Sequence, residues 1–166
     1  SLWNSFPTLY QRPGELGDRL HTIYNEVLNR HHKVFLIGAD LPHLPYRRLL
    51  EANEELNRYK YVMGETDDGG FYLFGGKNPI SKATWNSVIY SSEHTARDLK
   101  KTLQSLGNAH FKNLAVEFDI DYDEDLKKLS GVTLPVRLRL LADGKKKAGY
   151  EGSFLFTHTG FSGPAV

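Results

Sequence analysis

The chain has 166 residues, enough for one domain or for one domain and part of another. Its formal net charge of +1 argues against a nucleic-acid-binding protein, and the absence of cysteine excludes disulfides and thiolate metal sites. The sequence has neither a membrane-spanning apolar run nor a signal-peptide pattern, so we expect a cytoplasmic location. Because it begins Ser1-Leu2-Trp3 and stops at Val166 without a polar tail, we expect material to be missing at both ends.

Apolar spacing through most of the chain alternates between helical and strand periodicity. The predicted elements are, in chain order, a helix over residues 18–30, a strand over 34–38, a helix over 45–59, strands over 61–63 and 71–74, a helix over 93–106 and a strand over 114–120. The strand at 34–38 is apolar throughout, which is the pattern of a strand covered on both faces in a parallel sheet. We therefore predict an α/β fold, a three-layer α/β/α sandwich with a mainly parallel sheet.

The composition changes toward the C-terminal end. Apolar residues alternate with arginines over residues 136–140, Asp143-Gly144 is a turn signal, and a second apolar strand ends at 154–156. This pattern predicts a β-hairpin. We place the domain boundary at the change, with an α/β domain over residues 1–129 and a hairpin tail over 130–166.

The first candidate functional residue is Asp40, within Leu36-Ile37-Gly38-Ala39-Asp40-Leu41-Pro42. An apolar strand that ends in a carboxylate places that group at the carboxyl edge of the sheet, where open α/β sheets bind their ligands. A carboxylate there can hold Mg²⁺ or Mn²⁺, and the metal can bridge nucleotide phosphates and neutralise leaving-group charge. A capping or turn aspartate before Pro42 is the alternative, and the pattern alone leaves both open.

The second candidate is Asp67-Asp68-Gly69-Gly70, which joins the two predicted strands at 61–63 and 71–74. Paired glycines let a backbone approach a ligand closely or adopt positive φ. A plain hairpin turn would use the same residues, and spacing alone favours the turn.

The third candidate is Asp119-Ile120-Asp121, where a predicted strand hands over to a helix. The carboxylates that follow, Asp123 and Asp125, suit a helix start because they complement the helix dipole. Asp121 is better placed to reach the same sheet edge as Asp40, if the two strands are neighbours.

Five segments, taken in order, resemble a bacterial family of nucleotide-diphospho-sugar-transferase-like proteins with a GT-A type fold, over residues 11–129. The matching stretches are Gln11-Arg12-Pro13-Gly14-Glu15-Leu16-Gly17-Asp18-Arg19, Leu36-Ile37-Gly38-Ala39-Asp40-Leu41-Pro42, Asp68-Gly69-Gly70-Phe71-Tyr72-Leu73, Tyr90-Ser91-Ser92 with Thr95, and Asp119-Ile120-Asp121 with Glu124-Asp125-Leu126. The resemblance implies a metal-dependent glycosyltransferase whose partner is a nucleotide-diphosphate sugar, with neither nucleic acid nor membrane expected.

The resemblance also implies roles for individual residues. Asp40 looks like the metal- and diphosphate-binding carboxylate, and Asp121 looks like the second carboxylate beside the Mg²⁺ or Mn²⁺ ion. Asp68, Gly69 and Gly70 would bind the nucleotide sugar on the acceptor side of the cleft. No residue of the chain is assigned as the catalytic base.

The chain departs from that family at its beginning. Members start with a strand and a loop that grips the nucleotide, and this sequence shows neither. We therefore expect a fold truncated at its N-terminus, with an unpaired sheet edge. The chain would then be inactive unless another protein supplies the missing piece.

The tail resembles a different family. Residues 131–166, with the wording Phe156-Thr157-His158 and Ser162-Gly163-Pro164-Ala165, look like part of the domain inserted into an FAD-dependent flavoprotein. The dinucleotide-binding glycine fingerprint is absent, so FAD is not expected to bind this fragment alone. Two alternatives to a transferase therefore stay open, a non-catalytic binding module and a fragment of a fused FAD-dependent oxidoreductase.

Overall fold

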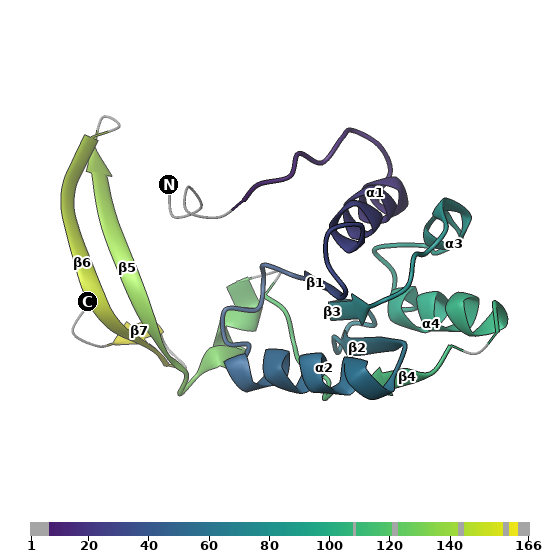
Figure 1. Ribbon diagram of the computed structural model, residues 1–166. Helices are drawn as coiled ribbons and strands as arrows, with labels where there is room; N and C mark the ends of the chain where they lie inside the picture. Colours follow the sequence, from purple (N-terminus) through teal and green to yellow (C-terminus); the bar gives the residue numbers. More distant parts are fainter. Residues whose placement is uncertain (1–6, 108, 121–122, 143–144, 158–159, 163–166) are drawn as a thin grey trace. The chain divides into compact units, whose positions relative to one another are not determined.

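The computed structural model describes residues 7–107, 109–120, 123–142, 145–157 and 160–162 (Figure 1). The chain divides into two compact units, one of residues 1–38 with 45–118 and one of residues 39–44 with 119–166. Within the described ranges, every helix is too short or too polar to cross a membrane. The domain boundary placed at residues 129 and 130 from composition stays a prediction.

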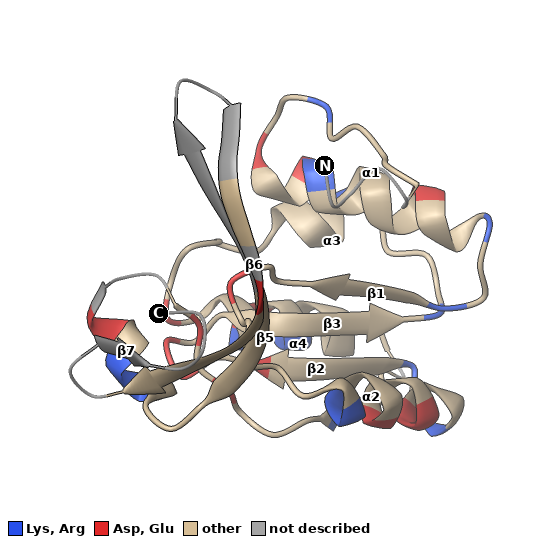
Figure 2. Cartoon of the chain, turned by 90° about the vertical axis from the view of Figure 1, so that its left-hand side faces the viewer, with Lys and Arg blue, Asp and Glu red and all other residues tan. Residues whose placement is uncertain are grey.

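The first unit is built on a four-stranded mixed sheet. Its strands are β1 (Val34–Ile37), β2 (Tyr61–Glu65), β3 (Phe71–Gly76) and β4 (Phe111–Asn113), in the spatial order β1-β3-β2-β4. Both β1 and β2 pair with β3 in antiparallel fashion, whereas β4 pairs with β2 in parallel. Three strands therefore run one way and β3 alone opposes them. Figure 2 shows β3 between β1 and β2, with its arrow reversed. The predicted α/β fold is confirmed, with a sheet that is mixed.

Four helices pack around this sheet. They are α1 (Leu16–Leu28), α2 (Tyr46–Arg58), α3 (Lys82–Asn86) and α4 (Thr95–Ser105). The predicted helices match α1, α2 and α4 to within a few residues, while the five-residue α3 was not predicted. The strand predicted over residues 114–120 is wrong in position, because the regular strand β4 ends at Asn113 and Glu117 forms only an isolated bridge with Thr66.

The main core lies between the sheet and α1, α3 and α4. Tyr24, Phe74 and Trp85 meet with ring-centroid distances of 5.4–5.9 Å, and all three side chains are fully buried. Their edge-to-face and tilted geometries are those preferred by aromatic rings in protein cores. Two leucines of α4, Leu99 and Leu103, complete this cluster. The α2 helix contributes Ala52 and Leu56, both fully buried, through its contacts with β2 and β3, and carries charged residues on its exposed surface (Figure 2).

A close contact between α1 and α3 fixes the beginning of α1. Gly17 is buried, and a Cβ atom there would overlap the Trp85 carbonyl and the Asn86 side chain. Next to it, Asp18 Oδ1 accepts a hydrogen bond from Asn86 Nδ2 at 2.6 Å. The same oxygen forms an ion pair with Lys82 Nζ at 3.1 Å. The hydrogen bond from Asn86, followed by that from Lys82, lowers the pKa of the Asp18 carboxyl group.

The second unit carries the predicted β-hairpin. After the 3₁₀ helix η2 (Asp123–Leu129) come β5 (Thr133–Ala142), β6 (Lys145–Thr157) and β7 (Gly160–Ser162), paired antiparallel in that order. The pairing of β5 with β6 confirms the hairpin, and its turn at Asp143-Gly144 lies outside the described residues. Gly131 N donates to Phe156 O at 2.8 Å, which ties the end of η2 to β6.

Candidate functional site

Asp40 follows the carboxyl end of β1 by three residues. The amide of Gly38 donates to the carbonyl of Tyr72 at 2.9 Å, so the pairing of β1 with β3 runs to within two residues of Asp40. Asp40 is exposed, and within the described ranges its carboxylate has neither a hydrogen bond nor an ion pair. The carboxylate is therefore open to a ligand.

The backbone of the second unit brings the third candidate segment to Asp40. Ile120 N donates to Asp40 O at 3.2 Å, although the two residues are far apart in sequence. Ile120 thus lies beside Asp40, although β1 and β4 are not neighbours in the sheet. Asp121 itself lies outside the described residues, so its distance from Asp40 stays a prediction.

The carboxylate of Asp68 is engaged with its own turn. Its Oδ1 accepts from Thr66 Oγ1 at 2.5 Å and from Gly70 N at 2.9 Å, which closes the connection between β2 and β3. An aspartate that bonds to backbone two residues ahead is a common turn-forming device. The hairpin-turn interpretation of this segment is therefore correct, and a role in ligand binding stays a prediction.

Gly69 joins this turn to α4. Its φ of +90° lies in the region that favours glycine, and a Cβ atom at this position would collide with the backbone of Glu93. The carbonyl of Gly69 also accepts a hydrogen bond from Ala96 N at 3.0 Å, which satisfies an amide in the first turn of α4. The glycine is thus required for close packing of two backbone segments.

The donor set suits a hard divalent cation if Asp40 and Asp121 act together. Within the described ranges, no group of three or more His, Asp or Glu side chains gathers in a way that could hold a metal ion. Mg²⁺ in nucleotide enzymes is usually held by one or two carboxylates together with phosphate oxygens and water. A pair of carboxylates is therefore a sufficient protein contribution.

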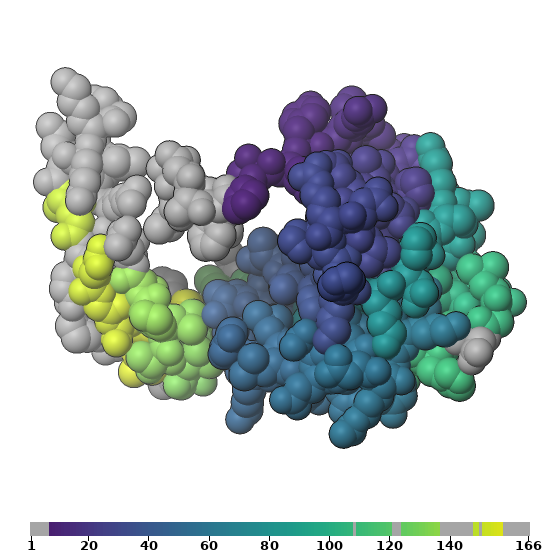
Figure 3. All heavy atoms as spheres, in the orientation of Figure 1, coloured from purple at the N-terminus to yellow at the C-terminus, as the bar shows by residue number. Residues whose placement is uncertain are grey.

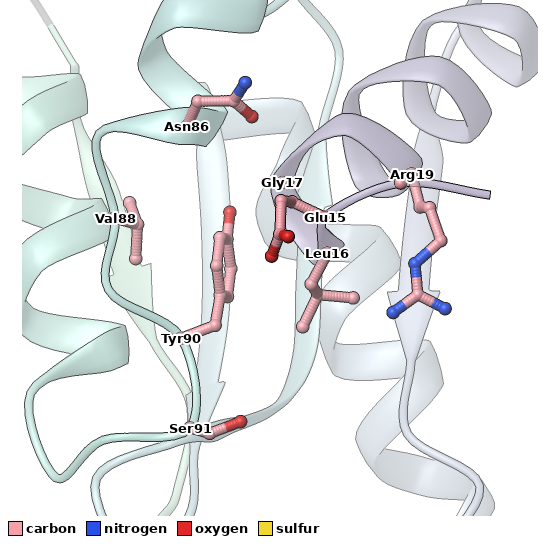
Figure 4. A pocket seen from close by; sticks show the side chains of 9 residues that line it. Glu15, Leu16, Gly17, Arg19, Asn86, Val88, Tyr90 and Ser91 are labelled. Carbon is pink, nitrogen blue, oxygen red and sulfur yellow. The ribbon is translucent and has the colours of Figure 1, made fainter. Parts of the chain in front are cut away.

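A pocket of about 510 Å³ lies entirely within the first unit, between the start of α1 and the loop after α3 (Figure 4). Its lining residues are Gly14, Glu15, Leu16, Gly17, Arg19, Asn86, Val88, Tyr90 and Ser91. The Tyr90 hydroxyl donates to Trp85 O at 2.8 Å, and burial of the Tyr90 side chain raises the pKa of this hydroxyl. The pocket combines an aromatic face with polar groups, so it can accept a small organic ligand.

This pocket was not predicted from the sequence, although both of its sides belong to segments that carry the transferase resemblance. Arg19 Nε is buried there without a hydrogen-bond partner, and Ser91 has a φ of 56°, uncommon for a residue other than glycine. The local signal was a glycine-rich stretch and a Tyr-Ser-Ser stretch. Their contact depends on the approach of α1 to α3, which no local pattern encodes.

Comparison with solved structures places the fold in a known class. The chain is similar to the crystal structure of a protein from Desulfovibrio desulfuricans G20 described as a putative nucleotide-diphospho-sugar transferase, with a TM-score of 0.66 and 22% sequence identity. The match covers 72% of this chain and 52% of that one, so this chain spans about half the length of its structural relative. At this identity the likeness establishes a transferase-like fold.

The family follows from sequence comparison. The chain belongs to the bacterial family described as "uncharacterized protein conserved in bacteria (DUF2064)", which matches residues 2–92, more than half of its length. A second family, described as the "HI0933-like protein barrel and H2TH domain", matches residues 114–166. Both resemblances identified from sequence motifs are thus confirmed. No curated protein matches the chain.

Proposed function

We propose that this chain is the later part of a metal-dependent glycosyltransferase that takes its sugar from a nucleotide-diphosphate donor. The observation that carries the proposal is the placement of Asp40 in a transferase-like fold. Its free carboxylate follows the carboxyl end of β1, and its backbone accepts a hydrogen bond from Ile120. The finer architecture expected from the family, a three-layer sandwich with a mainly parallel sheet, belongs to this proposal.

In this proposal Asp40 and Asp121 hold Mg²⁺ or Mn²⁺. The metal, once bound, would neutralise charge on the donor diphosphate as the sugar is released. The chain's own contribution would be two carboxylates at the edge where open α/β sheets bind nucleotides. Asp68, Gly69 and Gly70 are proposed to contact the nucleotide sugar through the exposed side of their turn.

Thermal unfolding with and without ligand tests this proposal. A nucleoside diphosphate together with Mn²⁺ should raise the melting temperature, by about 3 °C for each kcal/mol of binding free energy linked to folding. Asp40→Asn should abolish that increase without lowering the melting temperature of the protein alone. Glu54→Gln, which removes an exposed carboxylate on α2, is the matched control and should keep the increase.

An unchanged melting temperature would contradict the proposal. If no nucleoside diphosphate shifts the melting temperature of the folded protein, Asp40 does not form a metal–diphosphate site. We also propose that the chain by itself binds the donor without transferring sugar, because it spans only about half of its structural relative. Binding without sugar release from the donor would then define it as a binding module, or as one part of an enzyme that needs a protein partner.

A second function is favoured by one specific observation, the match of residues 114–166 to the HI0933-like family. In this alternative the function resides in the tail, as part of an FAD-dependent flavoprotein. We expect the purified chain to be colourless, because the dinucleotide-binding glycine fingerprint is absent. Flavin absorbance that co-purifies with the protein would instead favour this alternative.

A further inference from the structure

A groove of about 460 Å³ lies along the outer side of α4 in the first unit, next to the edge strand β4. Figure 1 labels α4 and β4 at the right of the view, and Figure 3 shows the same region as spheres. Its lining residues are Arg97, Lys100, Lys101, Gln104, Ala109, His110, Phe111 and Asn113. Three of these lining residues, Arg97, Lys100 and Lys101, are cationic and none is acidic, so the groove is lined by positive charge.

Part of the positive charge of this groove is left uncompensated. Lys100 Nζ pairs with Glu65 Oε1 at 2.5 Å, and Arg97 Nε pairs with Asp98 Oδ1 at 3.1 Å. By contrast, the Lys101 ammonium has no hydrogen bond or ion pair within the described part of the chain. Arg97 also keeps its two terminal nitrogens available, because Asp98 engages only Nε. Two cationic groups on one helix surface can therefore meet a ligand.

The backbone of β4 adds donors to the same groove. In the parallel pairing with β2, Tyr61 N donates to His110 O, and Leu114 N donates to Met63 O. The backbone N–H and C=O groups of successive residues point to opposite sides of a strand. These two bonds therefore show that the backbone groups of His110, Lys112 and Leu114 point toward β2. The N–H groups of Phe111 and Asn113 consequently point away from β2, toward the open edge of the sheet.

We propose that this groove binds the phosphate group of a small phosphorylated ligand, a site separate from the one proposed at Asp40. Lys101 and the Arg97 guanidinium would approach the phosphate from α4, and the outward N–H groups of Phe111 and Asn113 would approach it from β4. Charged donors and backbone amides that converge on one point are the usual means of holding a phosphate. The volume also exceeds the needs of a phosphate alone, which leaves space for the organic part of the ligand.

A solvated face of α4 is the competing explanation for Lys101 and Arg97, since exposed cations on a helix commonly face only water. The two explanations differ at the strand edge. A solvated helix face would leave the amides of Phe111 and Asn113 unaffected by phosphate, whereas a phosphate site requires them to change.

Titration of the protein with inorganic phosphate at constant ionic strength, followed by amide NMR, separates these explanations. We expect the largest saturable shifts at the amides of Phe111 and Asn113. Lys101→Gln should raise the dissociation constant about fivefold, as expected for the loss of one exposed charge–charge contact. Arg47→Gln, which removes an exposed cation from α2, should leave it unchanged.

Two outcomes would overturn the proposal. One is the absence of saturable shifts at Phe111 and Asn113. The other is an equal loss of binding in the Lys101→Gln and Arg47→Gln variants, which would show that phosphate responds only to net charge. A glycerol phosphate titration extends the test, because tighter binding than that of inorganic phosphate is expected if the groove also contacts the organic part. The site differs from the Asp40 site in needing no divalent metal, so failure of one test leaves the other intact.

Discussion

Asp68 and Asp40 were both predicted from the sequence to bind a ligand, but their carboxylates differ in the contacts that they make. One carboxylate oxygen of Asp68 accepts hydrogen bonds from Thr66 and Gly70 of its own turn. Asp40 is held through its backbone carbonyl by Ile120, and its side chain is left free within the described residues. This difference shows that an Asp-Gly-Gly stretch can be explained by the structure of its own turn. Folding does not explain an exposed carboxylate after a strand in the same way.

The largest effect is expected at Gly69, where the turn meets α4. Gly69→Ala should lower the free energy of unfolding by about 3 kcal/mol, because its φ of +90° is strained for alanine and its Cβ would collide with the Glu93 backbone. Gly107→Ala is the matched control, since Gly107 has a φ of +88° but no atom within 4 Å of an added Cβ. That variant should cost only the backbone term, about 1 kcal/mol. Urea unfolding measures both, and equal losses would contradict a packing role for Gly69.

The next effect tests the carboxylate itself. Asp68→Ala should cost about 2 kcal/mol, because the buried hydroxyl of Thr66 and the amide of Gly70 both lose their acceptor. Asp68→Asn keeps an oxygen in the same place and should recover most of this loss. If Asp68→Ala is neutral in urea unfolding, the turn does not depend on Asp68, and the comparison with Asp40 fails.

A smaller effect is expected at Tyr72 of β3, whose carbonyl accepts a hydrogen bond from Gly38 N. Its hydroxyl donates to Ala115 O at 3.0 Å, so Tyr72→Phe should cost about 1 kcal/mol. Burial raises the pKa of Tyr72 to about 12 from its ordinary value of 10.0. Between these values the unfolded chain releases the phenolic proton while the folded chain keeps it, so stability falls as pH rises through this window. Unfolding measured across that range should show a shallower decline in Tyr72→Phe, and an unchanged slope would contradict this role.

Much of the fold could be predicted because its signals are local. Apolar periodicity located α1, α2, α4 and the β5–β6 hairpin to within a few residues. The short helix α3 offers too few residues for a period to show. The predicted strand at 114–120 failed because an apolar run such as Leu114 to Val116 becomes a strand only where a neighbour pairs with it, and Val116 is 61% exposed.

The candidate site was less accessible to prediction, because it depends on contacts between distant parts of the chain. The position of Asp40 after β1 followed from an apolar run that ends in a carboxylate. The bond from Ile120 to Asp40 joins residues 80 positions apart, and the ion pair from Lys82 to Asp18 joins residues 64 apart (120 − 40 and 82 − 18). No periodicity encodes such pairs, so the pocket beside Gly17 was not predicted.

The smallest effect on stability is expected at Asp40, and it completes the comparison. Asp40→Ala should change the free energy of unfolding by less than about 0.5 kcal/mol, because an exposed carboxylate without a partner contributes little to folding. The backbone carbonyl that accepts from Ile120 is unchanged in this variant. The same substitution should remove all stabilisation by a nucleoside diphosphate with Mn²⁺, which Asp68→Asn should retain in part. A loss of stability in Asp40→Ala as large as that in Asp68→Ala would show instead that Asp40 is a structural turn residue, and its assignment as a metal ligand would then have to be abandoned.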